Sequence, residues 1–306
     1  MFAPPKTIDT QIFATLPKEL LLTDRESAFM RDIFHGRKVG AFLEGPSFDR
    51  DGNLIMVDIA HGRILRLSAK KEWSVVTQYE GAPNGLKIHK DGRYFVSDRV
   101  NGIMIVDPVN GEVETYIGRK DLAGFKGPND LFFASNGDLY FTDQGDSGLH
   151  DPTGRVFRKR AKDGALECLI SNVPSPNGLV MDPAEQSLLL AVTRANCVWR
   201  LPMRNDGSVH RVGLYCQLMG GWGPDGLAMD VDGNCVIAHA GGAALWIWSP
   251  MGLPLYHIRA CDGGLLTTNM AYGGPNNRTL FITNSLESNV LVAEVPVAGL
   301  KMFGQM

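Results

Sequence analysis

The chain has 306 residues, of which 44% are hydrophobic and 21% charged, and its 30 basic and 33 acidic side chains give a net charge of −3 at pH 7. This near balance gives no sign of the basic surface that binding to nucleic acids or anionic membranes requires. The longest aliphatic run covers only residues 188–192, which is far too short to cross a bilayer.

The first 37 residues are predicted to form an extension that precedes the repeats of a single domain, 1–306, whose blades occupy 38–306. Thr23 and Glu26 have the spacing of a capping box, which predicts a short helix that ends near Phe34. Residues 38–42, directly before the first repeat, are predicted to form a strand.

From residue 44 onward one short motif recurs along the chain. Its copies are Glu44-Gly45-Pro46, Pro83-Asn84-Gly85, Pro128-Asn129-Asp130, Pro176-Asn177-Gly178 and Pro224-Asp225-Gly226, with a degenerate sixth copy around Asn269. Successive Asn or Asp positions are 45, 48, 48 and 44 residues apart. This is the period of a four-stranded propeller blade.

Each period has the same internal order. A turn at the Pro-Asn-Gly triplet is followed by an apolar strand, a hairpin signal such as Lys90-Asp91-Gly92, and then further strands. Six such units predict an all-β fold, a six-bladed β-propeller. The last unit stops after its third strand, near Val295, and an unpaired edge invites aggregation. Residues 38–42 are therefore predicted to close the ring as the outer strand of the last blade.

The repeated motif predicts a metal site at the centre. The first strand of each propeller blade lies closest to the axis, so the six oxygen-bearing side chains at its start converge there: Glu44, Asn84, Asn129, Asn177, Asp225 and Asn269. Two carboxylates facing each other repel, and a divalent cation removes that conflict. Oxygen ligands without His or Cys favour Ca²⁺, with Mg²⁺, Mn²⁺ or Zn²⁺ as alternatives.

The second strands return to the same end of the propeller and are predicted to frame its mouth. Their last residues are Asp58, Asp98, Asp143, Thr193, His239 and Asn284. Blade 3 carries the longest insertion there, residues 144–154, which is expected to fold over the opening. Trp222 is the tryptophan expected to line the pocket.

Three of these motifs carry a resemblance to a known family. Glu44-Gly45-Pro46, Pro176-Asn177-Gly178-Leu179 and Gly223-Pro224-Asp225-Gly226 resemble the signature of the SMP-30/gluconolactonase/luciferin-regenerating-enzyme family. The resemblance extends from about Val39 to Val295. It implies a six-bladed propeller that binds a divalent cation at its axis and hydrolyses lactones.

The resemblance also implies roles for individual residues. Glu44, Asn177 and Asp225 match the metal ligands of the family, and Asn129 matches a residue that is a ligand in some members and a substrate contact in others. Asn84, Asn129, Asp130, Trp222 and Asn269 are the predicted substrate contacts. Asp225, His239 and Asp143 are the candidates for the proton transfer, and the sequence leaves the choice among them open.

Two other functions compete with a lactonase. The same metal centre also suits a phosphotriester or fluorophosphate hydrolase, and many propellers are non-catalytic interaction platforms. The sequence favours a small lactone as the partner and leaves monomer and homo-oligomer open. Five cysteines without a CxxC pair, and no secretory signal pattern, favour a cytoplasmic location.

Overall fold

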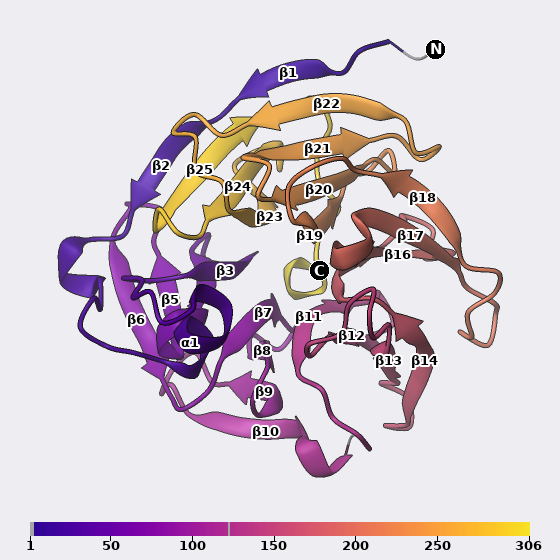
Figure 1. The fold of residues 1–306 in the computed structure, drawn as a ribbon, viewed down its shortest axis with the longest axis horizontal. Helices are drawn as coiled ribbons and strands as arrows, with labels where there is room; N and C mark the ends of the chain where they lie inside the picture. Colours follow the sequence, from indigo (N-terminus) through magenta and orange to yellow (C-terminus); the bar gives the residue numbers. More distant parts are fainter. Residues whose placement is uncertain (1–2, 122) are drawn as a thin grey trace.

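The computed structural model describes residues 3–121 and 123–306. Its strands form six sheets arranged around a central axis (Figure 1). In each sheet four antiparallel strands follow one another outward from that axis, and one sheet has a fifth, outermost strand. The fold is thus the predicted six-bladed β-propeller.

Blades 1 to 4 each consist of four strands that follow one another in the chain. Blade 1 holds β3 (Leu43–Phe48), β4 (Leu54–Asp58), β5 (Arg63–Leu67) and β6 (Trp73–Gln78). Blade 2 holds β7 (Pro83–Ile88), β8 (Tyr94–Asp98), β9 (Gly102–Val106) and β10 (Val113–Gly118). Blade 3 holds β11 (Pro128–Phe133), β12 (Leu139–Asp143), β13 (Gly154–Lys159) and β14 (Leu166–Val173). Blade 4 holds β15 (Pro176–Met181), β16 (Ser187–Val192), β17 (Cys197–Pro202) and β18 (Gly213–Gln217).

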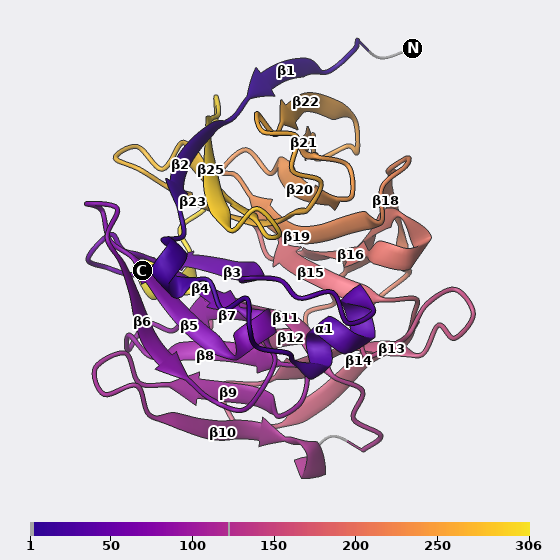
Figure 2. The same cartoon turned by 60° about the vertical axis from the view of Figure 1, so that its left-hand side comes forward.

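The last two blades each combine strands from the C-terminal part of the chain with one strand from near its N-terminus. Blade 5 holds β19 (Gly223–Met229), β20 (Cys235–Ala240), β21 (Ala244–Trp248) and β22 (Pro254–Arg259), and β1 (Lys6–Asp9) pairs with β22 in parallel. Blade 6 holds β23 (Thr267–Gly273), β24 (Thr279–Asn284) and β25 (Asn289–Glu294), with β2 (Gln11–Thr15) as its outer strand. Figure 2 shows β1 and β2 running along the outside of these two blades.

The prediction that residues 38–42 complete the last blade is wrong. The outer strand of blade 6 is β2, which pairs antiparallel to β25 with Gln11 opposite Val292 and Thr15 opposite Asn289. Residues 38–42 instead lead into β3. Most of β2 is exposed, since only Ala14 is buried, so its sequence lacks the apolar pattern by which an inner strand is recognised.

The predicted N-terminal helix exists but starts later than expected. Helix α1 spans Ala28–Phe34, and Ser27 is its N-cap, with the side-chain oxygen accepting a hydrogen bond from the Met30 N–H (3.3 Å). Serine is a favoured N-cap, and here it replaces the predicted cap at Thr23. The helix ends at Phe34, as predicted, because His35 takes the left-handed conformation with φ of 51°.

The core lies between neighbouring blades. Every residue of β4, β8 and β12 is buried, because each second strand is covered by other blades on both faces. This explains why these strands form nearly continuous apolar runs in the sequence.

The end of the chain covers one end of the central channel (Figure 1). The short 3-10 helix η5 (Phe303–Gln305) places Phe303 against Phe133, with ring centroids 5.3 Å apart. The Arg50 side chain donates hydrogen bonds to the carbonyl oxygens of Gly304 and Met306 (both 3.2 Å). The opposite end of the first strands, where the repeated motifs lie, is therefore the open one.

Candidate metal centre and its cavity

The repeated motifs form the beginnings of the six innermost strands, β3, β7, β11, β15, β19 and β23. The prediction that each Pro-Asn-Gly triplet is a turn is wrong, since Pro83, Asn84 and Gly85 all belong to β7. The glycine serves another purpose there. A methyl group at Gly85 would overlap the Asp130 carboxylate of the next blade and lie 2.8 Å from Ser97 Oγ. Gly226 is similarly covered by the side chain of Asn269.

Strand register decides which residues occupy the axial ring. Leu43, Pro83 and Pro128 pair with Asp58, Asp98 and Asp143, so the residues that follow them, Glu44, Asn84 and Asn129, are equivalent. In blade 6 it is Thr267 that pairs with Asn284.

Thr268 is therefore the sixth member of the ring, and the prediction that Asn269 fills this position is wrong. The N–H of Asn269 donates to Thr283 Oγ1 (3.1 Å), as the N–H of Asp130 donates to Thr142 Oγ1 (3.0 Å). Asp130 and Asn269 thus stand where other blades have glycine, one residue further along the strand.

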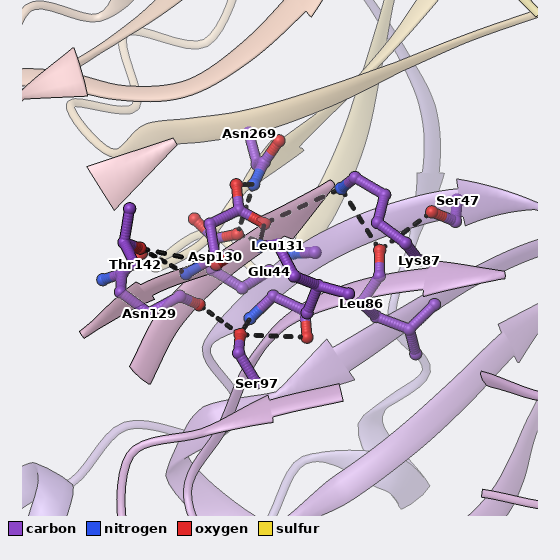
Figure 3. A network of polar contacts seen from close by, with 12 residues as sticks. Glu44, Ser47, Leu86, Lys87, Ser97, Asn129, Asp130, Leu131, Thr142 and Asn269 are labelled. Atoms are coloured by element: carbon purple, nitrogen blue, oxygen red, sulfur yellow. Dashed lines mark hydrogen bonds and ion pairs between the residues drawn. The ribbon is translucent and has the colours of Figure 1, made fainter. Parts of the chain in front are cut away.

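A buried polar network joins these positions across the axis (Figure 3). The Asn269 side-chain amide donates to Glu44 Oε2 (2.9 Å) and to Asp130 Oδ2 (3.5 Å). The Gly45 N–H also donates to Glu44 Oε2 (2.6 Å), and the Lys87 ammonium lies 3.8 Å from Asp130 Oδ1. Asp130 and Asn269 were predicted to touch substrate, but both are buried in this network and neither lines the cavity described below.

Burial and nearby negative charge raise the pKa values of two carboxylates at the axis, those of Glu44 and Asp225. Burial raises the pKa of Glu44 from 4.5 to about 7, and the charge of Asp130 adds to the rise. Burial likewise raises the pKa of Asp225 well above its ordinary value, with further contributions from Glu44 and Asp130, while Asn177 and Arg194 lower it. The three acids therefore lack sufficient compensating positive charge, a situation that a divalent cation resolves.

The amides of the ring suit such a cation. Asn129 Nδ2 donates to Gln144 Oε1 (2.9 Å), and Gln144 Nε2 donates in turn to Ser175 Oγ (3.0 Å). These contacts orient the Asn129 amide and use its nitrogen, which leaves the oxygen for a hard cation. Within residues 3–121 and 123–306, no three His, Cys, Asp or Glu side chains form a metal-binding group. Two carboxylates and two amides, from Glu44, Asp225, Asn129 and Asn177, are the donor set that fits.

A cavity of about 650 Å³ opens at the mouth of the propeller, a size typical of small-molecule sites. Asn177 and Asp225 lie on its wall together with Trp222, which is about half exposed. Residues 144–150 of the blade 3 insertion also line it, as expected for a loop over the opening.

Sequence reasoning missed several residues of the cavity wall, among them Arg99, Arg194, His150 and Ile33 of α1. A signal existed for the two arginines, because each follows directly on a predicted second-strand end, Asp98 or Thr193. For Ile33 there was none, since nothing in the sequence places α1 beside the mouth.

Two of the candidates for proton transfer, His239 and Asp143, make hydrogen bonds within the protein that exclude this role. His239 is buried, with Nε2 2.9 Å from the Gly220 carbonyl oxygen and Nδ1 accepting a hydrogen bond from the Trp246 indole N–H (3.3 Å). Those partners assign a neutral ring with its proton on Nε2. Neither nitrogen is available to a substrate, so the structure contradicts the predicted role of His239.

Asp143 has a structural role as well. Its carboxylate accepts hydrogen bonds from the N–H groups of Lys126 (3.1 Å) and Gly127 (2.7 Å) and pairs with Arg155. The same contact occurs in blade 1, where Asp58 Oδ1 accepts from the Phe42 N–H (2.8 Å). These acids tie the start of each first strand to the end of the second. The geometry therefore leaves no role for Asp143 in proton transfer.

The predicted contact Asn84 is half-buried in the ring, and its side chain makes no hydrogen bond with the part of the chain that the structure describes. Neither Asn84 nor Asn129 lines the cavity, but both hold positions of the axial ring equivalent to that of Asp225, and their contact with substrate stays a prediction. No helix among the described residues has the length and apolar character needed to cross a bilayer.

Comparison with known proteins agrees with this architecture. The profile of the SMP-30/gluconolactonase/LRE-like region matches residues 42–285. A lactonase, drp35 of Staphylococcus epidermidis, is 29% identical over 267 residues, which are 82% of this chain and 80% of that protein. A gluconolactonase structure from Xanthomonas campestris has a TM-score of 0.73 at 21% identity, covering 96% of this chain and 98% of that one. Regucalcin of Agrobacterium tumefaciens, described as a calcium-binding protein, has a TM-score of 0.78 at 17% identity, covering 99% of this chain and all of that one.

Proposed function

The chain belongs to the SMP-30/gluconolactonase/LRE-like family, and from that premise we propose that it is a hydrolase of small lactones that depends on a divalent cation. The observation that carries the proposal is the group of mutually repelling carboxylates at the propeller axis, of which Glu44 and Asp130 are buried, while Asp225 is half-buried and lines an open cavity. The similarity to a lactonase and to a calcium-binding protein supports the same activity and the same ion.

Glu44, Asn129, Asn177 and Asp225 would hold the cation, and their oxygen atoms favour Ca²⁺ over softer ions. A cation bound there supplies Lewis-acid polarisation of the lactone carbonyl and stabilisation of the charge that develops on its oxygen. The Lys87 ammonium next to Asp130 and the Asn269 amide on Glu44 keep the donors in place.

Asp225 is the residue assigned to proton transfer. It is the acid of the axial group that lines the cavity, and His239 and Asp143 are engaged elsewhere. Its carboxylate would orient a water molecule and accept a proton as the water oxygen bonds to the carbonyl carbon. The ring C–O bond then breaks, and the proton passes to the departing alkoxide oxygen, so that the product is a hydroxy acid. Asn84, Asn129 and Trp222 would position the lactone.

The test is a lactone panel assayed by acid release before and after removal of metal with a chelator. We expect loss of activity on chelation, recovery with added Ca²⁺, and loss of at least about 100-fold in kcat for Asp225→Asn. Asp146→Asn, a change of the other carboxylate on the cavity wall, should retain activity within about threefold, because a solvated surface ion pair adds little.

Full turnover by the stripped protein would overturn the metal-dependent mechanism. A fluorophosphate assayed in parallel separates the competing hydrolase, and turnover of that substrate alone would replace the lactonase assignment.

A further inference from the structure

Arg194 stands out among the charged residues of the cavity. The ionisable side chains on the cavity wall are Arg99, Asp146, His150, Arg194 and Asp225. The Arg99 guanidinium donates to the Gly145 carbonyl oxygen (3.1 Å) and pairs with Asp146. Arg194 is an exposed residue whose guanidinium makes no hydrogen bond or ion pair with any residue in 3–121 or 123–306, although its charge lowers the pKa of Asp225.

The backbone around Arg194 is held firmly against the strand that carries Asp225. Arg194 lies in the 3-10 helix η4 (Thr193–Ala195), where Thr193 Oγ1 donates to the Pro224 carbonyl oxygen (2.8 Å). The Thr193 carbonyl oxygen lies so close to Gly223 that a side chain at residue 223 would overlap it. The neighbouring Asn196 amide donates to the Gly220 carbonyl oxygen (2.8 Å). The cation of Arg194 is therefore carried on a fixed support beside the axial centre.

The insertion of blade 3 packs against the side chain of Arg194 from the other side. A methyl group at Gly148 would lie 3.9 Å from Arg194 Cγ, an ordinary contact distance. Residue 148 of the loop therefore lies beside the aliphatic part of Arg194, and both residues line the cavity.

The charge of Arg194 reaches Asp225, whose pKa it lowers, but a cation-loaded axial centre would be neutral without it. Glu44, Asp130 and Asp225 carry three negative charges, and Lys87 with a divalent cation carries three positive ones. Arg99 and Asp146 neutralise each other on the cavity wall. One positive charge, that of Arg194, is left facing the space where substrate binds.

We propose that Arg194 binds an anionic substituent of the substrate, a carboxylate or a phosphate, which is separate from the ester bond that is cleaved. The proposal rests on the function proposed above and makes it more specific: the preferred substrate is an acidic lactone. A guanidinium is well suited to this role because its planar array of N–H groups binds carboxylate and phosphate oxygens in pairs.

The experiment compares three lactones with the same sugar ring on the Ca²⁺-loaded full chain: glucono-δ-lactone, its 6-phosphate, and the corresponding 6-carboxylate. The wild-type chain should prefer one or both anionic lactones over the neutral one by at least about tenfold in kcat/KM. Arg194→Gln should remove that preference through KM, a loss of roughly 10- to 100-fold on the anionic lactone. Its loss on the neutral lactone, which reports only the effect of the missing charge on Asp225, should be much smaller.

Arg194→Lys should restore part of the preference, because it keeps the charge without the paired N–H groups. Arg278→Gln is the control, since Arg278 is an exposed arginine beside the hairpin between β23 and β24, at the covered end of the propeller. Raising the salt concentration should weaken the wild-type preference and leave Arg194→Gln unaffected.

The anionic lactone whose kcat/KM falls in Arg194→Gln shows whether Arg194 binds a carboxylate or a phosphate. Two outcomes would overturn the role of Arg194 but leave the lactonase assignment intact. One is an equal loss on the neutral and anionic lactones in Arg194→Gln, and the other is hydrolysis of all three lactones by the wild-type chain without preference. Absence of turnover on every lactone of the panel would overturn the lactonase assignment and this inference with it.

Discussion

At the scale of single residues, the axial centre has two layers. Glu44, Asn129, Asn177 and Asp225 would hold the proposed cation, and Asp130 and Asn269 connect Glu44 to Lys87. The sequence suggests the first layer because its residues recur with the blade period, and their role as ligands stays a prediction. It placed Asp130 and Asn269 wrongly, because both stand at glycine positions and only strand register reveals the offset.

The second layer depends on the glycine of the neighbouring blade, and Gly85→Ala tests this. The added methyl group would overlap the Asp130 carboxylate, so we expect a loss of about 1–3 kcal/mol in unfolding free energy together with weaker Ca²⁺ binding. Denaturant titration and calorimetry measure the two effects. Gly213→Ala is the control, because nothing lies within 4 Å of the new methyl group, and an equal loss in both variants would contradict the account.

The raised pKa of Glu44 predicts a pH dependence for the metal-free chain. The folded chain holds a proton on Glu44 up to about pH 7, whereas the unfolded chain releases it near 4.5. The folded state therefore binds more protons, and its stability falls as the pH rises from about 4.5 to 7, by at most about 3 kcal/mol.

The same proton competes with the cation, so Ca²⁺ affinity should increase between pH 6 and pH 8. Thermal unfolding of the metal-free chain between about pH 4.5 and 7, compared with Glu44→Gln, isolates the contribution of Glu44. Identical pH profiles for the two proteins would disprove the assignment.

At the scale of elements, the blades are held by acids at the ends of their second strands. The sequence located Asp58, Asp98 and Asp143 at those ends but assigned them to the rim of the active site. Polar residues at strand ends are ambiguous until their partners are known. Here the partners are N–H groups of residues directly before the first strands, and arginines such as Arg63 and Arg155. The start of α1 and the identity of the closing strand were misjudged for a similar reason, because short exposed segments carry weak patterns.

Replacing one of these acids should destabilise its blade. Asp58 is fully buried and lies 2.6 Å from Arg63 Nη2, so Asp58→Ala leaves a buried guanidinium and the Phe42 N–H unpaired and should cost about 3–5 kcal/mol. Asp9→Ala breaks the exposed pair with Arg259, whose side chains are 63% and 61% exposed, and should cost less than 1 kcal/mol. Chemical denaturation compares the two, and similar costs would refute the structural role of Asp58.

At the scale of the whole molecule, the chain joins its two ends across the last blades. The six-fold repetition was evident in the sequence because every blade needs the same inner strands. The outer strand of blade 6 was not evident in the sequence, because β2 consists of residues 11–15, which lie far from the repeats. The contact of Phe303 with Phe133 at the covered end of the channel likewise belongs to no repeat and left no signal.

Two truncations test how the N-terminal strands contribute. Removal of residues 1–9 takes away β1, which is mostly exposed, and should lower the Tm by only a few degrees. Removal of residues 1–16 also takes away β2, leaves the edge of β25 unpaired, and should lower the Tm much further and promote aggregation. Light scattering during thermal unfolding records both effects, and equal behaviour of the two truncations would show that β2 is dispensable.

The central claim is that one divalent cation sits at the propeller axis between the two acids of the ring. Crystals grown with Mn²⁺ in place of Ca²⁺ and measured at the manganese absorption edge test it directly. The account predicts a single strong anomalous peak bounded by oxygen atoms of Glu44, Asn129, Asn177 and Asp225. An axis without such a peak, in a protein that still hydrolyses lactones under the same conditions, would contradict it.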